Sequence, residues 1–230
     1  MGTRQLRILP YTGERAYQYY IDGLKVNGKR QRLFFKDEKS AKAKLKVFTP
    51  KQLANLLAAA GPSLLPALAL QAFAGLRTAE VLRLEWSDVD LVRGIVTAAA
   101  HKSKTARRRL IPIAQNLAEW LRPYAQMSGP VYSTKTRNYH ADIEALRSSI
   151  GLSTWPNNGL RHSFASYHLA KHQNAPQLAL EMGHSTPRMI FENYREVVAP
   201  AEAERYWTTG QTILPTTLSG SRRPYEPLFL

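Results

Sequence analysis

The stretch Thr49-Pro50-Lys51-Gln52 decides where the helical body of this chain begins. Threonine is a good helix N-cap, proline fits the first helical position, and a glutamine three residues after the cap completes a capping box. Apolar residues then recur at helical spacing, at Leu53, Leu56, Leu57 and Ala60. The sequence therefore predicts an amphipathic helix at the start of a largely helical unit.

Further helices are expected downstream of this first one. A second helix is predicted from about Ser63 to Ala74, ending at Gly75, and a third from a Thr78 cap through Leu84. From residue 115 the pattern is again helical, and the last helix is expected to end near residue 207. Breaks are predicted at the glycine- and proline-containing stretches 129–130, 151–159 and 183–187.

One β-hairpin interrupts the helical pattern. The stretches Ile95–Ala100 and Arg109–Ile113 are rich in β-prone residues, and the basic segment His101–Arg108 separates them. We expect two paired strands with Lys104 at the tip of the hairpin or on its flank.

The first 48 residues differ from the rest in charge. They hold 12 Lys/Arg and 4 Asp/Glu, which leaves +8 of the formal net charge of +15 in this short segment. Asn27-Gly28 is a strong hairpin turn signal. We predict a three-stranded sheet and a basic helix here, formed by a strand near Arg4–Leu9, strands at Arg15–Ile21 and Arg30–Phe35, and a helix at Asp37–Lys46.

Composition limits the possible partners and compartments. The chain has 230 residues, 44% of them hydrophobic, and a pI near 10.2, so it can bury a core and still attract a polyanion. Nucleic acid is the first candidate partner and a membrane surface the second. The sequence contains no cysteine, no run of about 20 apolar residues and no signal-peptide core, so a cytoplasmic protein without membrane spans is expected.

Five side chains spread along the chain suit the cleavage of a phosphodiester: Arg77, Lys104, Arg161, His184 and Tyr194. Guanidinium groups stay charged and match phosphate oxygens bidentately. A tyrosine can form a covalent intermediate, and a lysine among other cations is a plausible general acid. This chemistry needs no metal, no cofactor is implied, and the six histidines show no zinc-type spacing.

Each of these residues alone has an ordinary alternative. Arg77 could be a surface arginine at a helix start, and Lys104 could sit in a solvated basic turn. The pair Arg161-His162 could open a capped helix with a core histidine, His184 could belong to a helix cap, and Tyr194 could pack in a core. Their occurrence together, each within a short characteristic motif and in one order, argues against coincidence.

The order and spacing of these motifs resemble the catalytic domain of tyrosine recombinases, the phage integrase family. The resemblance covers roughly residues 48–207 and rests on GLRTAE (75–80), Lys104, GLRHS (159–163), GHS (183–185) and NYR (193–195). It implies an α+β, mainly α fold with a small β-hairpin or sheet. It also implies that Tyr194 attacks DNA to give a 3′-phosphotyrosyl link and a free 5′-hydroxyl, while Arg77, Arg161, Lys104 and His184 act on the phosphate.

One position departs from the family pattern. Asn158 stands three residues before Arg161, where a histidine is usual, and an amide can hydrogen-bond a phosphate oxygen but cannot donate a proton as an acid. We assign Asn158 to the catalytic set as a residue that hydrogen-bonds the phosphate. Glu80 and His162 are assigned supporting roles, and DNA contacts are expected from Lys25, Lys29, Arg30, Arg32, Lys102, Arg107, Arg108 and Arg109.

The expected organisation has three parts: a basic arm-binding-like unit at residues 1–47, a catalytic domain at 48–209 and a tail at 210–230. Integrases of this kind normally carry a helical core-binding domain between the first two parts, and the sequence leaves no room for it. We expect a mobile-element or phage recombinase that binds double-stranded DNA and self-associates on it. Two alternatives stay open, namely a non-catalytic DNA-binding relic and a relaxing topoisomerase.

Overall fold

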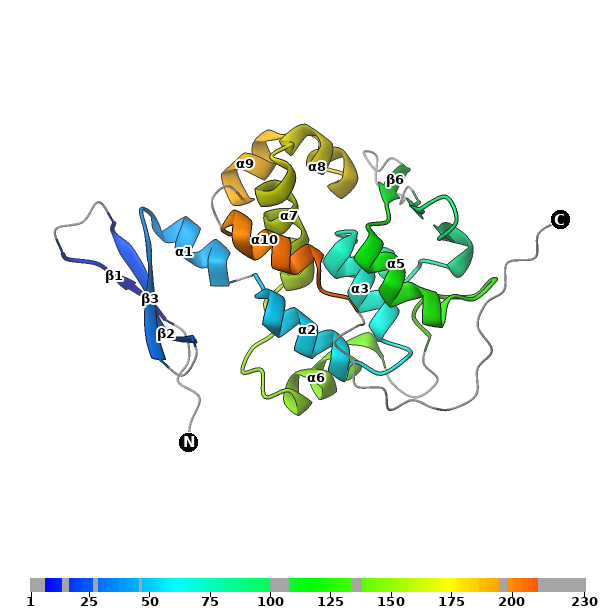
Figure 1. The fold of residues 1–230 in the computed structure, drawn as a ribbon, viewed down its shortest axis with the longest axis horizontal. Coiled ribbons are helices and arrows are strands. Elements are labelled where there is room, and N and C mark those ends of the chain that lie inside the picture. The colour runs from blue at the N-terminus through cyan, green and yellow to red at the C-terminus, as the bar shows by residue number, and fades with distance from the viewer. Residues whose placement is uncertain are drawn as a thin grey trace.

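Residues 7–13, 17–26, 29–45, 47–99, 108–133, 138–194 and 198–210 are described by a computed structural model of the protein. Helices dominate it, and two three-stranded antiparallel sheets accompany them. Figure 1 shows the N-terminal sheet on one side of the helical body and the second sheet on the opposite side. The predicted fold class, mainly α with small β-sheets, is confirmed. Within the described ranges, no helix combines the length and hydropathy needed to cross a membrane.

The N-terminal sheet has the order β1-β2-β3, with α1 packed against it. Strand β2 pairs with β3 from Tyr19 opposite Phe35 to Val26 opposite Lys29, so the strand lies later in the sequence than predicted. Backbone pairing decides this, because Leu24, Lys25 and Val26 lie opposite Gln31, Arg30 and Lys29 of β3. The predicted turn residues, 27 and 28, lie outside the described residues. The elements are β1 (Arg7–Pro10), β2 (Tyr19–Val26), β3 (Lys29–Phe35) and α1 (Glu38–Leu45).

The capping box predicted for the first body helix is present in α2 (Pro50–Ala59). The Gln52 backbone N–H donates to the Thr49 hydroxyl over 3.2 Å, and the Thr49 backbone N–H donates to Oε1 of Gln52 over 2.9 Å. Leu53, Leu56 and Leu57 are fully buried. The prediction of an amphipathic helix beginning at residue 50 is confirmed.

Helix α3 (Leu65–Phe73) lies at the centre of the body, and all nine of its residues are buried. Its sequence is apolar all round except for one glutamine, which is the pattern of a helix surrounded by protein. It packs against α7, α5 and α2. As predicted, the helix ends just before Gly75, whose φ of +63° is the left-handed conformation that glycine adopts most readily.

Helix α4 (Thr78–Val81) differs from its prediction. It spans four residues rather than the six expected after a Thr78 cap, and its N-cap is Arg77, not Thr78. The Glu80 carboxylate accepts from the Arg77 backbone N–H, which fixes the cap one residue earlier. After Val81 the backbone tightens, since the Arg83 and Leu84 N–H groups donate to carbonyl oxygens three residues earlier, each over 3.1 Å, in place of the four-residue spacing of an α-helix.

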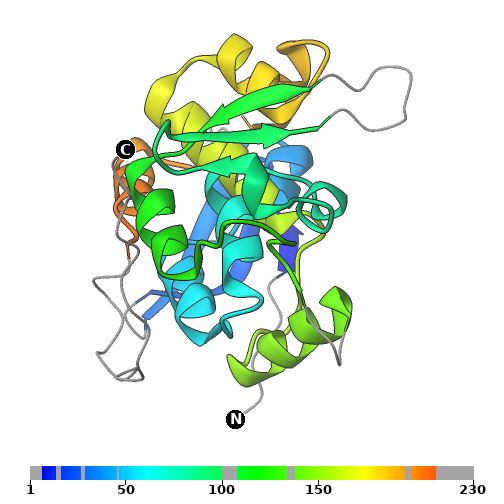
Figure 2. The ribbon, with the colours of Figure 1, turned by 90° about the vertical axis from the view of Figure 1, so that its right-hand side faces the viewer.

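The second sheet contains the predicted hairpin. Strands β5 (Ile95–Ala98) and β6 (Arg109–Pro112) pair antiparallel, with Ala98 opposite Arg109, and β4 (Val89–Asp90) adds an unpredicted third strand. Two residues are too few to show a strand periodicity in the sequence. In Figure 2 these strands run across the body below α8 and α9. Residues 100–107, which include Lys104, lie outside the described residues.

The remaining elements are helical, as predicted from residue 115 onward, and breaks fall at the three predicted glycine and proline stretches. A further break, at Gln173-Asn174, was not predicted. Gln173 adopts a left-handed backbone there, and the Asn174 side chain caps the helix that follows. Helix α7 is the hub of this region, since it packs against α3, α8, α9 and α10. The α10 helix ends at Trp207, and only the first residue of the predicted tail is described. The elements are η1 (Trp86–Asp88), α5 (Gln115–Leu121), η2 (Arg122–Tyr124), α6 (Tyr139–Ser149), α7 (Gly159–His172), α8 (Ala175–Met182), α9 (Arg188–Tyr194) and α10 (Pro200–Trp207).

Candidate active site

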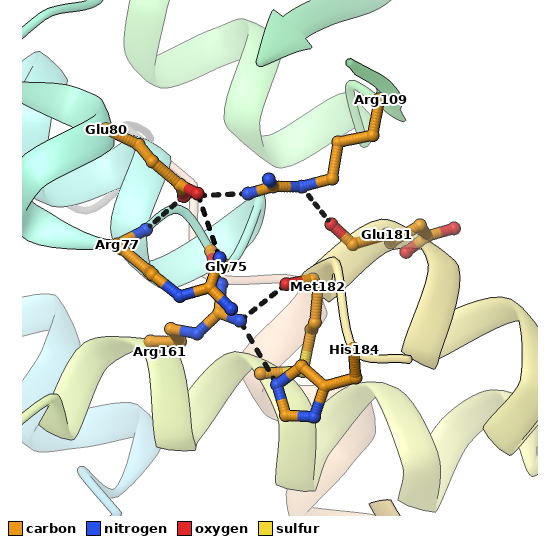
Figure 3. A network of polar contacts seen from close by, with 8 residues as sticks. All are labelled: Gly75, Arg77, Glu80, Arg109, Arg161, Glu181, Met182 and His184. Carbon is orange, nitrogen blue, oxygen red and sulfur yellow. Dashed lines mark hydrogen bonds and ion pairs between the residues drawn. The ribbon is translucent and has the colours of Figure 1, made fainter. Parts of the chain in front are cut away.

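Four of the predicted site residues lie at helix ends that converge in the body. Arg77 is the N-cap of α4, Arg161 lies in the first turn of α7, His184 follows α8, and Tyr194 is the last residue of α9. Figure 3 shows Arg77, Arg161 and His184 pointing toward one another, together with Glu80 and Arg109. The fold therefore gathers side chains that are separated by up to 117 positions in the sequence.

Arg161 is almost completely buried, with 7% of its surface exposed. Its Nη1 donates to the carbonyl oxygen of Gly75, and its Nη2 donates to that of Met182 over 2.6 Å. Both carbonyls lie at helix C-terminal ends, where the helix dipole favours a cation. Burial, followed by the neighbouring Arg77 and Arg109, lowers the pKa of Arg161 to about 9, so the guanidinium stays charged at neutral pH.

Arg77 is held by the carboxylate of Glu80. Nη1 of Arg77 donates to Oε1 of Glu80 over 2.9 Å, and the Arg77 backbone N–H donates to Oε2 over 2.7 Å. The Arg77 side chain remains 44% exposed, so its guanidinium can reach a ligand at the surface. Although burial alone would raise the pKa of Glu80, hydrogen bonds from Arg109 and Arg77 lower it to about 2. Glu80 is therefore a carboxylate at all physiological pH values.

His184 lies against Arg161, with 3.2 Å between Nε2 of His184 and Nη2 of Arg161. Since the guanidinium can only donate, we assign Nε2 as the acceptor and place the imidazole proton on Nδ1. Burial and the charge of Arg161 lower the pKa of His184 to about 4. The imidazole is therefore neutral at pH 7 and can accept a hydrogen bond.

Tyr194 lies within the electrostatic field of this cluster. Its ring is buried, and its centroid is 5.6 Å from that of His162. Burial raises the pKa of the Tyr194 hydroxyl, while Arg161 and Arg77 act in the opposite direction. The phenol is therefore the resting form, and the arginines favour the phenolate that would act as a nucleophile.

Asn158 is the N-cap of α7 and is exposed, with a left-handed backbone at φ 53° and ψ 25°. Its side chain makes no capping hydrogen bond. It lines an open cavity of about 270 Å³ together with Arg161 and Thr78. The amide therefore faces space beside the arginine cluster, where it can reach a ligand.

The other predicted site residues are less fully described. Lys104, Lys102 and Arg107 lie outside the described residues, as do the side chains of Lys25, Lys29 and Arg30. Arg108 is exposed. Arg32 is exposed as well, and its guanidinium carbon lies 5.0 Å from the centroid of the Tyr20 ring. Arg109 differs from the expectation of an open DNA contact, because its side chain is 11% exposed and bonded inside the protein.

Sequence reasoning missed the groups that hold the arginines in place. These are the carbonyl oxygens of Gly75, Glu181 and Met182. No side-chain pattern could have identified them, because every residue carries a carbonyl. The only available signal was the pair of glycines, Gly75 and Gly183, which mark the two helix ends.

The site offers cation chemistry rather than a set of metal ligands. Both oxygens of Glu80 are occupied by arginine donors. In the part of the chain that the structure describes, no three or more His, Asp or Glu side chains form a possible metal site. Two guanidinium groups, a neutral imidazole and a phenol are suited to binding a phosphate and attacking it.

Comparison with known proteins identifies relatives of this arrangement. The model of the phage integrase family matches residues 46–199. Over 125 residues the chain is 29% identical to the tyrosine recombinase XerA of Thermococcus kodakarensis, and this match covers 49% of the chain and 43% of XerA. The chain thus spans less than half the length of this curated relative.

Solved structures share the fold. The catalytic domain of bacteriophage HP1 integrase superimposes with a TM-score of 0.52 at 22% identity, over 69% of this chain and 90% of that one. The Tn1549 transposon integrase in complex with a circular intermediate DNA has a TM-score of 0.52 at 18% identity, over 65% of this chain and 61% of that one. Because the family model spans well over half of the sequence, the chain belongs to the phage integrase family.

Proposed function

We propose that this protein is a site-specific recombinase that cuts and rejoins double-stranded DNA through a 3′-phosphotyrosyl intermediate. The observation that carries the proposal is the convergence of Arg77, Arg161 and His184 (Figure 3), beside a Tyr194 hydroxyl close enough for both arginines to act on its pKa. In the proposed step, the Tyr194 oxygen bonds to phosphorus and the bond to the 5′ oxygen breaks. The phenol loses its proton, and the leaving oxygen takes one up to become a free 5′-hydroxyl. A partner strand's 5′-hydroxyl reverses the step and reseals the DNA.

Arg77 and Arg161 would neutralise the charge that spreads over the non-bridging oxygens during the attack. Arg161 is held in advance by two backbone carbonyls and Arg77 by Glu80, so little reorganisation is needed when the phosphate arrives. The neutral His184 would help to orient Arg161 and accept a hydrogen bond in the site. Electrostatic groups that are held in place before the reaction usually make the largest single contribution to an enzyme's rate enhancement.

Lys104 and Asn158 complete the proposed set. Lys104 would protonate the leaving 5′ oxygen as a general acid. Asn158 would donate a hydrogen bond from its amide to a phosphate oxygen, in the place where the family usually has a histidine. We expect the reaction to proceed, but more slowly than with an acid at that position.

Double-stranded DNA is the proposed partner. The formal charge of +15 suits a polyanion, and the Tn1549 integrase, which shares the fold, is known in complex with DNA. We propose that residues 1–47 form a DNA-binding unit, that residues 48–209 form the catalytic domain, and that the protein acts without the core-binding domain. Self-association on DNA is part of the proposal, since exchange needs two duplexes. A protein without cysteine that acts on DNA fits the cytoplasm.

A covalent trapping assay tests the proposal. The full chain is incubated with a pool of labelled nicked duplexes of randomised sequence, and adducts are separated by denaturing electrophoresis. We expect a DNA-linked species that is lost in Tyr194→Phe, while DNA binding is kept. The matched control is Tyr17→Phe, which changes an exposed tyrosine of the N-terminal unit. An adduct that persists in Tyr194→Phe, or that maps to another tyrosine, contradicts the assignment.

Two further arms of the assay separate the alternatives. Excess chelator should leave the adduct intact, because the arginines supply the positive charge that magnesium supplies in nucleases. Loss of cleavage with chelator and rescue by magnesium would indicate a nuclease. A non-catalytic relic, which Asn158 motivates, predicts DNA binding without an adduct, and a topoisomerase predicts relaxation of supercoiled plasmid.

A further inference from the structure

Arg109 is the first residue of β6, the strand that leads out of the basic hairpin turn. It belongs to the run of arginines predicted to contact DNA, yet its side chain is largely buried. Its Nε donates to the carbonyl oxygen of Glu181 over 2.8 Å, and its Nη2 donates to Oε2 of Glu80 over 2.7 Å. Two of the three guanidinium nitrogens are thus engaged inside the protein.

Gly183 allows this close approach between β6 and the end of α8. It has a φ of +65°, and a Cβ atom added there would lie 3.2 Å from Nη1 of Arg109. A side chain at this position would therefore press on the guanidinium and strain the backbone. The absence of a side chain lets the arginine lie directly against the terminal turn of α8.

The carboxylate of Glu80 is the point where Arg109 meets Arg77. Oε2 accepts from both the Arg77 backbone N–H and Nη2 of Arg109, while Oε1 accepts from Nη1 of Arg77 (Figure 3). A carboxylate has enough lone pairs to hold both partners at once. Without Arg109, one side of Glu80 would lose its anchor, and the orientation of Arg77 would depend on a local contact three residues away.

The last turn of α8 is the point where Arg109 meets Arg161. Two successive carbonyl oxygens project from this turn: that of Glu181 binds Arg109 and that of Met182 binds Arg161. Both cations therefore lie at the negative end of the same helix dipole. A shift of this helix end would move Arg161 and, with it, the adjacent His184.

We infer that Arg109 is a positioning residue for DNA cleavage, which holds Arg77 through Glu80 and fixes the α8 end that binds Arg161, and that it does not contact a DNA phosphate. This inference rests on the proposed function. It differs from the role expected for a basic hairpin residue, which would add affinity through counterion release. The two roles predict opposite results for affinity and for the rate of cleavage.

Two variants of the full chain separate these roles. Arg109→Gln removes the charge, and Arg109→Lys keeps the charge but replaces a planar fork by a point charge that cannot serve both acceptors in the same way. Each is tested for its DNA dissociation constant across a salt series and for its single-turnover cleavage rate on nicked DNA at saturating protein. We expect both to cleave more slowly, on the order of a hundredfold, as small misplacements of catalytic groups can. The dissociation constant and salt dependence should stay near those of the unaltered protein.

The exposed neighbour Arg108 provides the comparison. Arg108→Gln should show the behaviour of a lost phosphate contact, namely weaker binding and a salt slope reduced by about one. The inference is overturned if Arg109→Gln shows that same behaviour and cleaves at the unaltered rate when saturated. It is also overturned if Arg109→Lys cleaves as fast as the unaltered protein.

A second measurement does not depend on cleavage, so it keeps the inference testable if the unaltered protein forms no adduct, an outcome that would contradict the proposed function instead. Arg109→Gln, Glu80→Gln and the double variant are compared by their free energies of unfolding. Because the two side chains bond directly, we expect a non-additive double-mutant cycle. Strict additivity would show that Arg109 does not hold Glu80 and would overturn the inference.

Discussion

At the scale of single residues, Arg161 is a cation in a place that water scarcely reaches. Burying a charge costs several kcal/mol unless bonds and opposite charges offset the loss of water. The carbonyls of Gly75 and Met182 and the carboxylate of Glu80 supply part of that compensation. With Arg77 and Arg109 close by, the site still lacks negative charge, and a phosphate would provide it.

Asn158 is the one site position that differs from the family pattern, and its role can be tested by substitutions that do not strain the backbone. Its φ of 53° suits glycine, and asparagine and histidine tolerate this region better than most residues. Asn158→Gly should slow cleavage about tenfold, the value of one hydrogen bond to a charged group. Asn158→His should speed cleavage, by up to about a hundredfold if the imidazole acts as a proton donor. Single-turnover cleavage of nicked DNA measures both changes.

The neighbouring exposed amide provides the control for this test. Asn157 lies in the same loop and lines the same cavity, but it is one position away from the place where the family has its histidine. Asn157→Gly should therefore leave the cleavage rate unchanged. Equal cleavage rates for the unaltered protein, Asn158→Gly and Asn158→His would show that the Asn158 amide does not reach the scissile phosphate.

At the scale of elements, the joint between α3 and α4 couples the core to the site. Gly75 has a left-handed backbone, its carbonyl holds Arg161, and an added Cβ would come 2.7 Å from Cε1 of Phe164 and nearer still to its neighbour in the ring. Gly75→Ala should therefore cost about 2–4 kcal/mol of unfolding free energy, from backbone strain and overpacking together. Gly94 has a similar φ of +68°, but an added Cβ would meet open space. Gly94→Ala should therefore lower the free energy of unfolding by only about 1 kcal/mol. Urea unfolding measures both free energies. If Gly75→Ala and Gly94→Ala lowered the free energy of unfolding equally, the Phe164 ring would have moved aside without cost.

The contact between α7 and α8 predicts a pH dependence of stability. Nε2 of His168 lies 3.3 Å from Oε2 of Glu181, and burial with the neighbouring His172 lowers the pKa of His168 from 6.5 to about 4. Below about pH 6.5 the unfolded chain takes up the proton first, so stability is complete above that pH and is lost as pH falls toward 4. The loss from His168 is at most about 3 kcal/mol. His184 adds to it in the same window, whereas the raised pKa of Glu181 acts in the opposite direction.

Thermal unfolding between pH 4 and 7 measures this effect. His168→Gln should lose less stability on acidification than the unaltered protein does, because the group that titrates in the unfolded chain is gone. His140→Gln changes an exposed histidine and is the matched control. The same pH dependence in His168→Gln and in the control would contradict the assignment to His168.

At the scale of the whole molecule, the charge is uneven. More than half of the net +15 belongs to the first 48 residues, and the exposed Arg77 and Arg108 add positive charge at the surface of the body. Contacts of this kind are mostly to phosphate, which gives affinity by counterion release but little sequence information. We expect DNA binding that weakens steeply with salt, with little discrimination between sites and little complete recombination by this chain alone.

Affinity for candidate attachment DNA and for random duplex, each measured across a salt series, tests this expectation. Proteins that recognise a DNA sequence specifically bind their site at least about a thousandfold more tightly than random duplex. A ratio above that level would contradict the expectation of weak discrimination and would show that this chain can read DNA sequence.

Local signals predicted much of the fold. The capping box at Thr49, the end of α3 at Gly75 and the β5–β6 hairpin were predicted correctly, because each depends on residues close together in the sequence. Helix α4 was predicted too long, because no glycine or proline marks the point after Val81 where its hydrogen bonds tighten. Strand β4 was missed, because its two residues are too few to show a strand periodicity.

The sequence by itself determined which chemical groups are available: the arginines, the histidine and the tyrosine, their order and the helices that carry them. Only the tertiary structure decided how these groups are held. Arg161 bonds to a carbonyl 86 positions away, and Arg109 bonds to groups 29 and 72 positions away. The backbone acceptors look alike in any sequence, and they become specific only when packing brings particular helix ends together. For that reason the sequence suggested that Arg109 faces DNA, whereas the fold turns it inward toward the site.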